Sequence, residues 1–456
     1  MNQSSNGTVT IDRILLQRWM NVRKMTAMHV AERAGLAPEK VGALLTSARD
    51  SSDVEATLLD CLAMALDVPA ASLRPPIAGQ PEVIIRNAEE LQRTRRRVDR
   101  DGHHFYNYYT LPAPEGTVAP VILDILCPAS TLPKLNNGHL EPAITVNLGP
   151  GPIHGRWAEE SSALSWQKLV ASAAGDWIVG DSYLESSYRP HSYSLASDMP
   201  ARIVSYTARS TISGIVEASR GWADDRRTSL VEHLQRFQRS GGDPGFAKRL
   251  HDVNSLGRAC GLPAAAVTSA LASSPDEVDL AVVRRIARAM AVDYRCLLPF
   301  EPTMDELGKR HLDVERSRAT ARRFRSYQVA DMAQSPELCD LVGAFMRIEG
   351  VASVLDLDDQ AGPRHYLVTG GEVVMNWRSG STTHSRTLRP DDSAWIAPFV
   401  PHGFHGDGAL IRLGSGDGLD DGSMLEAGRQ FDSAGAAARA FRDNANWGHD
   451  DKGGKS

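Results

Sequence analysis

The sequence has few cysteines and aromatic residues, and it has no long apolar run. Only 6% of its 456 residues are aromatic, and its cysteines number five, an odd count with no C-x-x-C pair. A disulfide framework or a thiolate zinc site is therefore disfavoured, and we expect the five thiols to be buried or idle. No stretch approaches the roughly 18 apolar residues of a membrane span, and the start MNQSSNGTVT is neither basic nor apolar. We expect a cytoplasmic protein with no membrane partner.

An excess of positive charge is also missing. The chain carries 50 Lys and Arg residues against 56 Asp and Glu residues, a net charge of −6, so no basic field favours nucleic acid or anionic lipid. With 42% hydrophobic and 23% charged residues, the composition is that of an ordinary globular protein. Because single cores stop growing near roughly 250–300 residues, the length predicts two to four domains.

The chain contains a tandem repeat. The segment AGLAPEKVGALL from Ala34 is echoed by CGLPAAAVTSAL from Cys260, and CLAMALDV from Cys61 is echoed by ARAMAVDY from Ala287. Both pairs are 226 residues apart, from 34 to 260 and from 61 to 287. Two landmarks with one offset indicate duplication.

Each copy begins with a helical pattern and continues with strands. Apolar residues at helical spacing surround a Gly-Leu pair, which is the pattern of helix-turn-helix, where glycine allows the tight turn. The helical parts end at Pro75 and Pro299. Strands are predicted at 118–126, 144–148, 203–208, 373–377 and 409–413. Since no helices intervene, we expect an antiparallel sandwich or barrel in each copy.

The sequence thus predicts an α+β chain of four domains. They are a helix-turn-helix-like helical domain 1 at 11–80, a first β domain at 81–230, a helix-turn-helix-like helical domain 2 at 231–300 and a second β domain at 301–446. We expect the first dozen residues and the tail after about Trp447 to lack regular structure.

Comparison of the two copies singles out one set of metal-ligand residue types. The 226-residue offset continues into the β parts, and a second block matches at an offset of 211, with Asp181 on Asp392. Under this pairing the first copy has His139, Glu185 and His191, where the second has His365, Ile396 and His402. Two histidines and a carboxylate form the facial triad of non-haem Fe(II), whose open positions can take substrate and O₂ together. We expect a metal site in the first copy and a structural second copy.

Less specific interpretations of these residues stay open. An isolated histidine or glutamate is more often a surface or satisfied core residue than a ligand, but the shared strand context favours metal for the three together. Glu141 and His154 are spare ligand candidates, although neither meets a ligand-type residue in the second copy. The duplication supports His139 and His191 more.

Several polar residues of the first copy lack a counterpart in the second. At the 226-residue offset two arginine pairs coincide, and we expect them to serve the structure: Arg96 with Arg322, and Arg97 with Arg323. The unshared pairs are Arg100 with Ser326, Tyr108 with Gln334, Asn136 with Gly362 and Lys24 with Leu250. The unshared side chains of the first copy suit a small doubly charged anion. The alternative for Arg100 and Lys24 is an exposed basic run or a solvated helix face.

Long blocks of the sequence resemble the 2-hydroxyethylphosphonate dioxygenase family, from about residue 11 to about residue 448. They are RWMNVRKMTA, RDGHHFYNYYTL, APVILDILCP, LNNGHLEPAITVNLGPG, WIVGDSYLESSYRPHSYSLA and ARIVSYTA. The resemblance implies a bicupin, a tandem repeat of a helix-turn-helix-like domain plus a cupin β-barrel, with a degenerate second cupin. It places Fe(II) in the first cupin on His139, Glu185 and His191. The implied substrate-binding residues are Arg100, Tyr108, Asn136 and Lys24, and the implied catalytic residues are Lys24, Tyr108 and Tyr183.

The resemblance also implies a reaction. Enzymes of this family use O₂ to cleave the carbon–carbon bond of 2-hydroxyethylphosphonate, giving hydroxymethylphosphonate and formate, in phosphonate or phosphinate antibiotic biosynthesis. The substrate supplies all four electrons, so no 2-oxoglutarate, flavin or nicotinamide is needed, in agreement with the absence of G-x-G-x-x-G and G-x-x-x-x-G-K-[ST] motifs. Lys24 would reach the barrel of its own or a partner chain to neutralise phosphonate and exclude water. Methylphosphonate synthase, a relative with the same substrate and fold, is the nearer alternative.

A function of another class also fits this layout. Helix-turn-helix followed by cupin is found in ligand-responsive transcription regulators, whose recognition helix carries basic or amide side chains toward base edges. The corresponding stretches here are PEKVGALL, with one lysine and one glutamate, and PAAAVTSAL, with no basic residue. We therefore expect no nucleic-acid partner. The expected partners are a small phosphonate and O₂, and a homodimer or higher homo-oligomer stays open.

Overall fold

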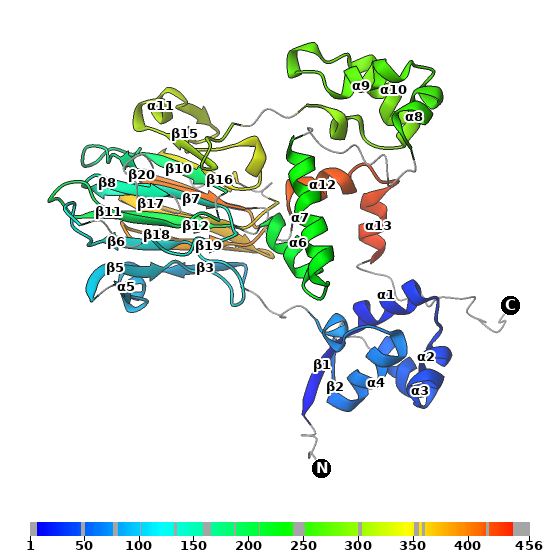
Figure 1. Cartoon of the computed structure of the whole chain (residues 1–456). Coiled ribbons are helices and arrows are strands. Elements are labelled where there is room, and N and C mark those ends of the chain that lie inside the picture. Colours follow the sequence, from blue (N-terminus) through cyan, green and yellow to red (C-terminus); the bar gives the residue numbers. More distant parts are fainter. Residues whose placement is uncertain are drawn as a thin grey trace. The chain divides into compact units, whose positions relative to one another are not determined.

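The structure is a computed structural model, and its residues fall into two compact units (Figure 1). The first unit joins Met1–Pro81 to Gly422–Ser456, and the second is Glu82–Asp421. The described residues are 7–46, 51–75, 81–100, 102–131, 135–157, 166–186, 188–208, 210–239, 251–299, 303–350, 355–357, 361–415 and 419–440.

The first unit is mainly helical. Its elements are β1 (Thr8–Asp12), α1 (Arg13–Arg23), α2 (Ala27–Ala34), α3 (Pro38–Leu45), β2 (Ser51–Glu55), α4 (Ala56–Leu66), η1 (Ala70–Leu73) and α13 (Ser433–Ala440), with α12 (Asp421–Ala427) at its boundary. Gly35, with a φ of +64°, ends α2 and permits the turn into α3. The core contains apolar residues from each of the first four helices, among them Leu16, Val30, Val41 and Leu62.

Strand β1 corrects the expectation that the first dozen residues lack regular structure. It pairs antiparallel with β2, from Thr8 opposite Glu55 to Asp12 opposite Ser51. Ile11 is buried and belongs to the same core as the helices. Burial of Ile11, together with packing of Val9 against the same core, stabilises a segment whose other residues are polar. The tail after Trp447 lies outside the described residues.

The second unit contains helices as well as sheets. They are α5 (Ala88–Arg93), α6 (Thr211–Ser219), α7 (Asp224–Arg239), α8 (Val253–Cys260), α9 (Ala264–Leu271), α10 (Leu280–Met290) and α11 (Val314–Ala319), with short turns η4 (Pro275–Glu277), η5 (Tyr294–Leu297) and η6 (Pro336–Leu338). Leu256, Val267 and Ile286 share a core that joins α8, α9 and α10. Helix α6 lies where only strands were expected. Ser210 caps it by accepting hydrogen bonds from two backbone N–H groups of its first turn.

Three antiparallel sheets make up the rest of the second unit. The seven-stranded sheet has the order β13-β10-β7-β12-β6-β5-β4, with β4 (Arg96–Arg100), β5 (His103–Thr110), β6 (Val121–Ile125), β7 (Ala143–Pro150), β10 (Ser182–Glu185), β12 (Ala201–Thr207) and β13 (Lys309–Leu312). The three-stranded sheet has the order β11-β8-β9, with β8 (Ile153–Trp157), β9 (Trp166–Leu169) and β11 (His191–Leu195). The eight-stranded sheet has the order β14-β15-β16-β20-β17-β19-β3, with β3 (Val83–Arg86), β14 (Arg322–Phe324), β15 (Tyr327–Asp331), β16 (Val342–Gly350), β17 (Arg364–Ser379), β19 (Ser393–Ile396) and β20 (His402–Gly414), and β18 (Thr382–Leu388) pairs with β17.

The expected mixture of helices and antiparallel sheets is confirmed. All five predicted strands are present, as β6, β7, β12, β17 and β20. The sheets differ from the predicted barrels, because no sheet among the described strands closes on itself. In the first half the strands are divided between two sheets. The edge strands are β9 and β11 in the three-stranded sheet and β4 and β13 in the seven-stranded sheet.

The two halves of the second unit exchange their leading strands. β3 precedes the first half but pairs with β19 of the second, and β13 precedes the second half but pairs with β10 of the first. Each exchange is anchored by an aspartate: Asp181 Oδ1 accepts from Val314 N at 2.9 Å, and Asp392 Oδ1 accepts from Ala88 N at 2.8 Å. Side chains of both halves also share one buried core. The exchange therefore makes each sheet dependent on the other half of the chain.

The strand register corrects how the two halves correspond. Ala143 on β7 lies opposite Glu185, and Arg364 on β17 lies opposite Ile396. Positions 143 and 364 are therefore equivalent, an offset of 221 rather than 226. The offset of 211 between Glu185 and Ile396 is retained.

Several pairings made at the 226-residue offset are consequently wrong. His365 takes the place of Ile144 rather than of His139, whose counterpart at position 360 lies outside the described residues. Asn136 and Leu357 each donate a backbone N–H to the carbonyl of the histidine that begins β11 or β20. Leu357 thus corresponds to Asn136, in place of the glycine at position 362. The leucine at position 250, which was paired with Lys24, lies outside the described residues.

A longer hairpin in the first half explains the change of offset. Tyr106 and Tyr327 are equivalent, because their hydroxyls accept corresponding hydrogen bonds. The Tyr106 hydroxyl accepts at 3.0 Å from the backbone N–H two residues after His191, and the Tyr327 hydroxyl accepts at 3.0 Å from the backbone N–H two residues after His402. Arg96 lies opposite Tyr108 on the next strand, as Arg322 lies opposite position 329. Strand β4 thus matches β14 at the offset of 226, whereas β5 matches β15 at the offset of 221. The β4–β5 hairpin is therefore five residues longer than the β14–β15 hairpin. Arg100 lies in this extension and has no counterpart at position 326.

Two expectations concern cysteines and membrane spans. All five cysteines are free thiols, and Cys127 and Cys260 are buried, whereas Cys296 and Cys339 are exposed. In the part of the chain that the structure describes, no helix has both the length and the apolarity needed to cross a membrane.

Candidate metal centre

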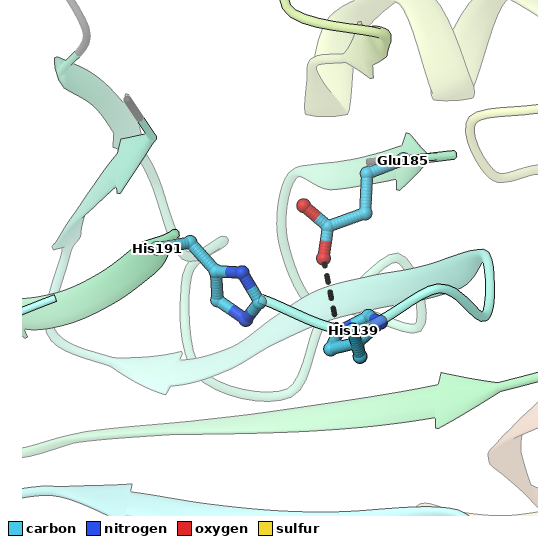
Figure 2. Close-up of side chains that lie close together, drawn as sticks. All are labelled: His139, Glu185 and His191. Atoms are coloured by element: carbon cyan, nitrogen blue, oxygen red, sulfur yellow. Dashed lines mark ion pairs between the residues drawn. The ribbon is translucent and has the colours of Figure 1, made fainter. Parts of the chain in front are cut away.

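Two histidines and a glutamate converge in the first half of the second unit. His139 lies in the loop before β7, Glu185 is the last residue of β10, and His191 is the first residue of β11. One possible ligand atom from each lies within 4.8 Å of the others (Figure 2). His139 Nε2 is 3.9 Å from Glu185 Oε1, and the two imidazole rings are 5.0 Å apart at 84°. The structure therefore brings together the three residues that the sequence selected.

Backbone carbonyls orient both imidazoles. The Nδ1 atom of His139 lies 2.6 Å from the carbonyl oxygen of Glu141, and that of His191 lies 3.1 Å from the carbonyl oxygen of Arg189. Donation from Nδ1–H leaves the Nε2 lone pair of each ring for a metal ion. Burial lowers the pKa of His191, the hydrogen bond to Arg189 opposes this, and the charge of Arg100 adds to the lowering. The imidazole of His191 is thus kept neutral, as a ligand must be.

Glu185 is a buried carboxylate with one strong donor. Its side chain is only 1% exposed, and desolvation raises its pKa to about 7, against the opposing effects of His139, Trp157 and Lys309. Trp157 Nε1–H donates to Glu185 Oε2 at 2.6 Å. The other carboxylate oxygen, Oε1, is the one that lies toward His139. The indole therefore holds one oxygen and leaves the second for an ion.

Asn136 fixes the strand that begins with His191. Its side-chain Oδ1 accepts from the backbone N–H of His191 at 2.9 Å and from that of Gly138 at 2.8 Å. Its own backbone N–H donates to the carbonyl of His191 at 2.9 Å. Asn136 thus positions a ligand-type histidine, and its expected contact with substrate stays a prediction.

Arg100 and Tyr108 lie on the β4–β5 hairpin. Arg100 Nη1 is 3.1 Å from the hydroxyl of Ser192, the residue after His191, and its guanidinium lies 5.2 Å from the ring of Tyr106. Tyr108 is half-buried and packs edge-on against Tyr106, with ring centres 6.0 Å apart. The hairpin extension therefore brings a guanidinium beside the strand of His191. The binding roles of both residues stay predictions.

Tyr183 and Lys24 differ in their surroundings. Tyr183 is fully buried on the same strand as Glu185, packs edge-on against Trp157 with ring centres 5.0 Å apart, and hydrogen-bonds through its hydroxyl to the hydroxyl of Tyr193. Burial raises its pKa well above the usual range, so the phenol stays protonated. Lys24 is exposed at the end of α1, in the first unit, with a left-handed φ of 56°. Its role at the site stays a prediction.

The two spare ligand candidates do not join the group. Glu141 accepts a hydrogen bond from Ser213 Oγ at 2.7 Å, and it is its backbone carbonyl that serves His139. His154 lies on β8 opposite Ser194. Among the described residues, neither belongs to the cluster of possible metal ligands.

Three residues around the site were not found from the sequence. Trp157 lies opposite His191 on β8, Tyr193 lies two positions after that histidine, and Lys309 lies opposite Glu185 on β13. Alternation along a strand could have revealed Tyr193, because positions i and i+2 share a face. Pairing between distant strands, which places Trp157 and Lys309, leaves no comparable local pattern.

The second half has a histidine, His402, at the position that corresponds to His191, and its ring nitrogens have partners within the protein. His402 Nε2 lies 2.8 Å from the hydroxyl of Tyr366, and Nδ1 lies 2.7 Å from the carbonyl oxygen of Val400. Both ring nitrogens are thus engaged within the protein. Burial lowers the pKa of His402 to about 4 and that of His365 to about 3. With Ile396 in place of a carboxylate, these are neutral core histidines.

Acid should destabilise the second unit through these histidines. Because their folded pKa lies below the unfolded value of 6.5, the unfolded state binds more protons as the pH falls, and stability present above pH 6.5 is lost. Between pH 6.5 and 5 the loss is roughly 2 kcal/mol for each histidine. We expect the urea midpoint of unfolding to fall over this interval, and to fall less in His402→Gln. An equal fall of the urea midpoint in the wild type and in His402→Gln would show that protonation of His402 does not cause the loss of stability.

Comparisons with known proteins agree with the geometry of the site. Residues 92–208 match the 2-hydroxyethylphosphonate dioxygenase cupin-like domain. A 2-hydroxyethylphosphonate dioxygenase from Streptomyces viridochromogenes is 45% identical over 443 residues, which is 96% of this chain and 99% of the relative. A solved structure of PhpD with cadmium, complexed with hydroethylphosphonate, is 44% identical with a TM-score of 0.82, and the match covers 94% of this chain and 99% of that chain. Methylphosphonate synthase from Nitrosopumilus maritimus is 29% identical over 175 residues, only 38% of this chain and 37% of the relative.

The similarity to the dioxygenase spans both units and both halves of the second unit, whereas that to the synthase covers little more than a third of the chain. Together with the convergent ligand residues, this similarity shows that the chain belongs to the 2-hydroxyethylphosphonate dioxygenase family.

Proposed function

We propose that this protein is an Fe(II)-dependent 2-hydroxyethylphosphonate dioxygenase. It cleaves the carbon–carbon bond of 2-hydroxyethylphosphonate with O₂ to give hydroxymethylphosphonate and formate. The observation that carries the proposal is the convergence of His139, Glu185 and His191 in a chain 45% identical to a dioxygenase over nearly its full length. The reaction balances without a further reductant, since one substrate and one O₂ contain all the atoms of the two products.

The ligand set suits iron. Two imidazole Nε2 atoms and one carboxylate oxygen are the donor set of non-haem Fe(II) sites with open positions. Iron bound here would supply Lewis acidity and O₂ activation. Trp157 and the carbonyl partners of the two histidines would orient these ligands.

Other side chains of the chain would bind and orient the substrate. Arg100 offers a guanidinium beside Ser192, and such a fork suits a phosphonate. Tyr108 and the amide N–H₂ of Asn136 would donate to phosphonate oxygens. The buried phenol of Tyr183 stays protonated and would act as a hydrogen-bond donor near the reacting atoms. Lys24 would neutralise the phosphonate and exclude water.

The same proposal covers the organisation of the chain. We propose a bicupin with helix-turn-helix-like domains at 11–80 and 231–300, a catalytic cupin at 81–230 and a degenerate cupin at 301–446. The glycine turns at Gly35 and Gly261, with φ of +64° and +63°, and the matched strand registers support the duplication. A cytoplasmic location, a homo-oligomeric state and a place in antibiotic biosynthesis belong to this proposal too.

Product analysis tests the proposed function. Protein loaded anaerobically with Fe(II) is mixed with 2-hydroxyethylphosphonate and O₂, and products are followed by phosphorus NMR and a formate assay. We expect hydroxymethylphosphonate with equimolar formate. Methylphosphonate would support the synthase instead, and no turnover by iron-loaded protein would contradict both. DNA binding that weakens steeply with salt would favour a transcription regulator.

A further inference from the structure

A lysine from the second half lies directly across from the candidate carboxylate ligand. β13 runs antiparallel to β10, and the register puts Lys309 opposite Glu185. Side chains at such positions are neighbours, with Cβ atoms about 5 Å apart. Lys309 is only 5% exposed, although an ammonium is rarely buried without partners. Its environment therefore indicates a specific role.

An indole joins the lysine to the carboxylate. Lys309 Nζ lies 4.5 Å from the centre of the Trp157 ring, and Trp157 Nε1–H donates to Glu185 Oε2 at 2.6 Å. Lys309 Nζ also lies 3.2 Å from Asp305 Oδ2 and 3.4 Å from Gln167 Oε1, so its position is fixed from two further sides. A cation over the face of an indole is attracted to the ring and holds it in place. The ring in turn determines which carboxylate oxygen is free.

The eight-stranded sheet lacks this arrangement at its equivalent positions. There β3 lies against β19 with Val83 opposite Ile396, so two aliphatic residues replace the lysine and the glutamate. A tryptophan is retained, since Trp377 lies opposite His402 on β20, as Trp157 lies opposite His191 on β11. The glutamate and the lysine thus face each other in the seven-stranded sheet and are both replaced in the eight-stranded sheet, whereas a tryptophan lies opposite the histidine in both halves.

We infer that Lys309 is a positioning residue of the metal centre. It holds Trp157 so that the indole fixes the carboxylate of Glu185 with one oxygen toward the histidines. The inference rests on the proposed metal site and adds a function for the strand exchange, because β13 brings this lysine from the second half of the chain. The degenerate half thereby contributes to the active one.

A purely electrostatic effect of Lys309 would have the opposite sign. A positive charge near a divalent ion opposes metal binding, so removal of the charge alone would tighten binding. Loss of an outer partner that orients a ligand instead weakens metal binding by about 10- to 100-fold. The lysine also lowers the pKa of Glu185, which lies at about 7, so metal binding is compared well above that pH, where the carboxylate is ionised in both proteins. Under this condition the direction of the change in Lys309→Met separates positioning from charge.

Titration of the full chain with Co(II), followed by visible absorption, tests the inference. We expect Lys309→Met and Trp157→Phe each to weaken Co(II) binding by about tenfold and to alter the visible Co(II) spectrum, which reports the coordination number and geometry of the ion. Lys309→Arg keeps the cation over the ring and should stay close to wild type. The double variant Lys309→Met, Trp157→Phe should bind no more weakly than Trp157→Phe, because the lysine acts through the indole.

Unchanged or tighter Co(II) binding by Lys309→Met, or additive losses in the double variant, would overturn the inference. Failure of the wild type to bind Co(II) would instead contradict the proposed function. Thermal unfolding of each metal-free protein identifies variants that do not fold, and Lys309→Gln then replaces Lys309→Met with the same expected weakening.

Discussion

Glu185→Ala is expected to abolish iron binding and turnover. The substitution removes the carboxylate from the group of three candidate ligands and leaves two imidazoles to hold a divalent ion. Loss of an outer partner already weakens metal sites by about 10- to 100-fold, so loss of the charged ligand itself should exceed about 100-fold. Iron content after anaerobic loading and desalting, together with formate release, measures the effect.

Ile396→Ala is the matched control, because position 396 is the counterpart of Glu185 in the eight-stranded sheet. Its side chain is buried, so the change should cost about 2–5 kcal/mol of stability and leave iron content and turnover of the folded protein nearly intact. The assignment of the active half would be reversed if His365→Ala and His402→Ala removed iron while Glu185→Ala retained it.

Arg100→Met should raise KM for 2-hydroxyethylphosphonate on the order of 10- to 100-fold. A charge-assisted hydrogen bond contributes about 1.5–3 kcal/mol, and Arg100 is the guanidinium that the hairpin extension adds beside Ser192. Iron content should not change, since Arg100 is no ligand. Steady-state kinetics and metal analysis of the same preparation separate the two effects.

Arg97→Met provides the comparison for Arg100→Met. Arg97 is on the same strand, but its side chain is 59% exposed and pairs with Asp99 at 2.8 Å. We expect its KM to stay near that of the wild type. An equal rise of KM in both variants would indicate a general effect of hairpin charge, and no rise in Arg100→Met would move the phosphonate site elsewhere.

Local pattern and internal repetition selected three residues that the structure brings together. The block that contains Glu185 and His191 repeats at an offset of 211 without a gap, so both residues were compared with their true counterparts. Strands β6, β7 and β12 of the same half were predicted because alternating apolar residues and turn residues are local signals. The structure then placed the third residue, His139, beside the other two.

The pairing of His139 with His365 was wrong for a physical reason. The five-residue extension of the β4–β5 hairpin moves everything after it, so an offset taken from the helical parts no longer applies. Pro142 and Pro363 share the correct offset of 221 and could have revealed the change. The selection of His139 was not affected by the error, because the residue that was wrongly paired with it, His365, is also a histidine.

The exchange of strands β3 and β13 could not be predicted from local sequence patterns. A run such as Lys309–Leu312 predicts at most an extended segment, and its partner is decided by contacts with β10, far away in the chain. The same is true of Trp157, whose bond to Glu185 depends on the meeting of two separate sheets. The residues that support Glu185 therefore had to be read from the structure, whereas the three candidate ligands could be selected from the sequence.

Oxygen stoichiometry tests the central claim most directly. Protein with one equivalent of Fe(II) is given excess 2-hydroxyethylphosphonate and limiting O₂, with no added reductant or cosubstrate. We predict one formate and one hydroxymethylphosphonate for each O₂ consumed, because the substrate supplies all four electrons. Formate production that requires an added reductant or 2-oxoglutarate would contradict the account.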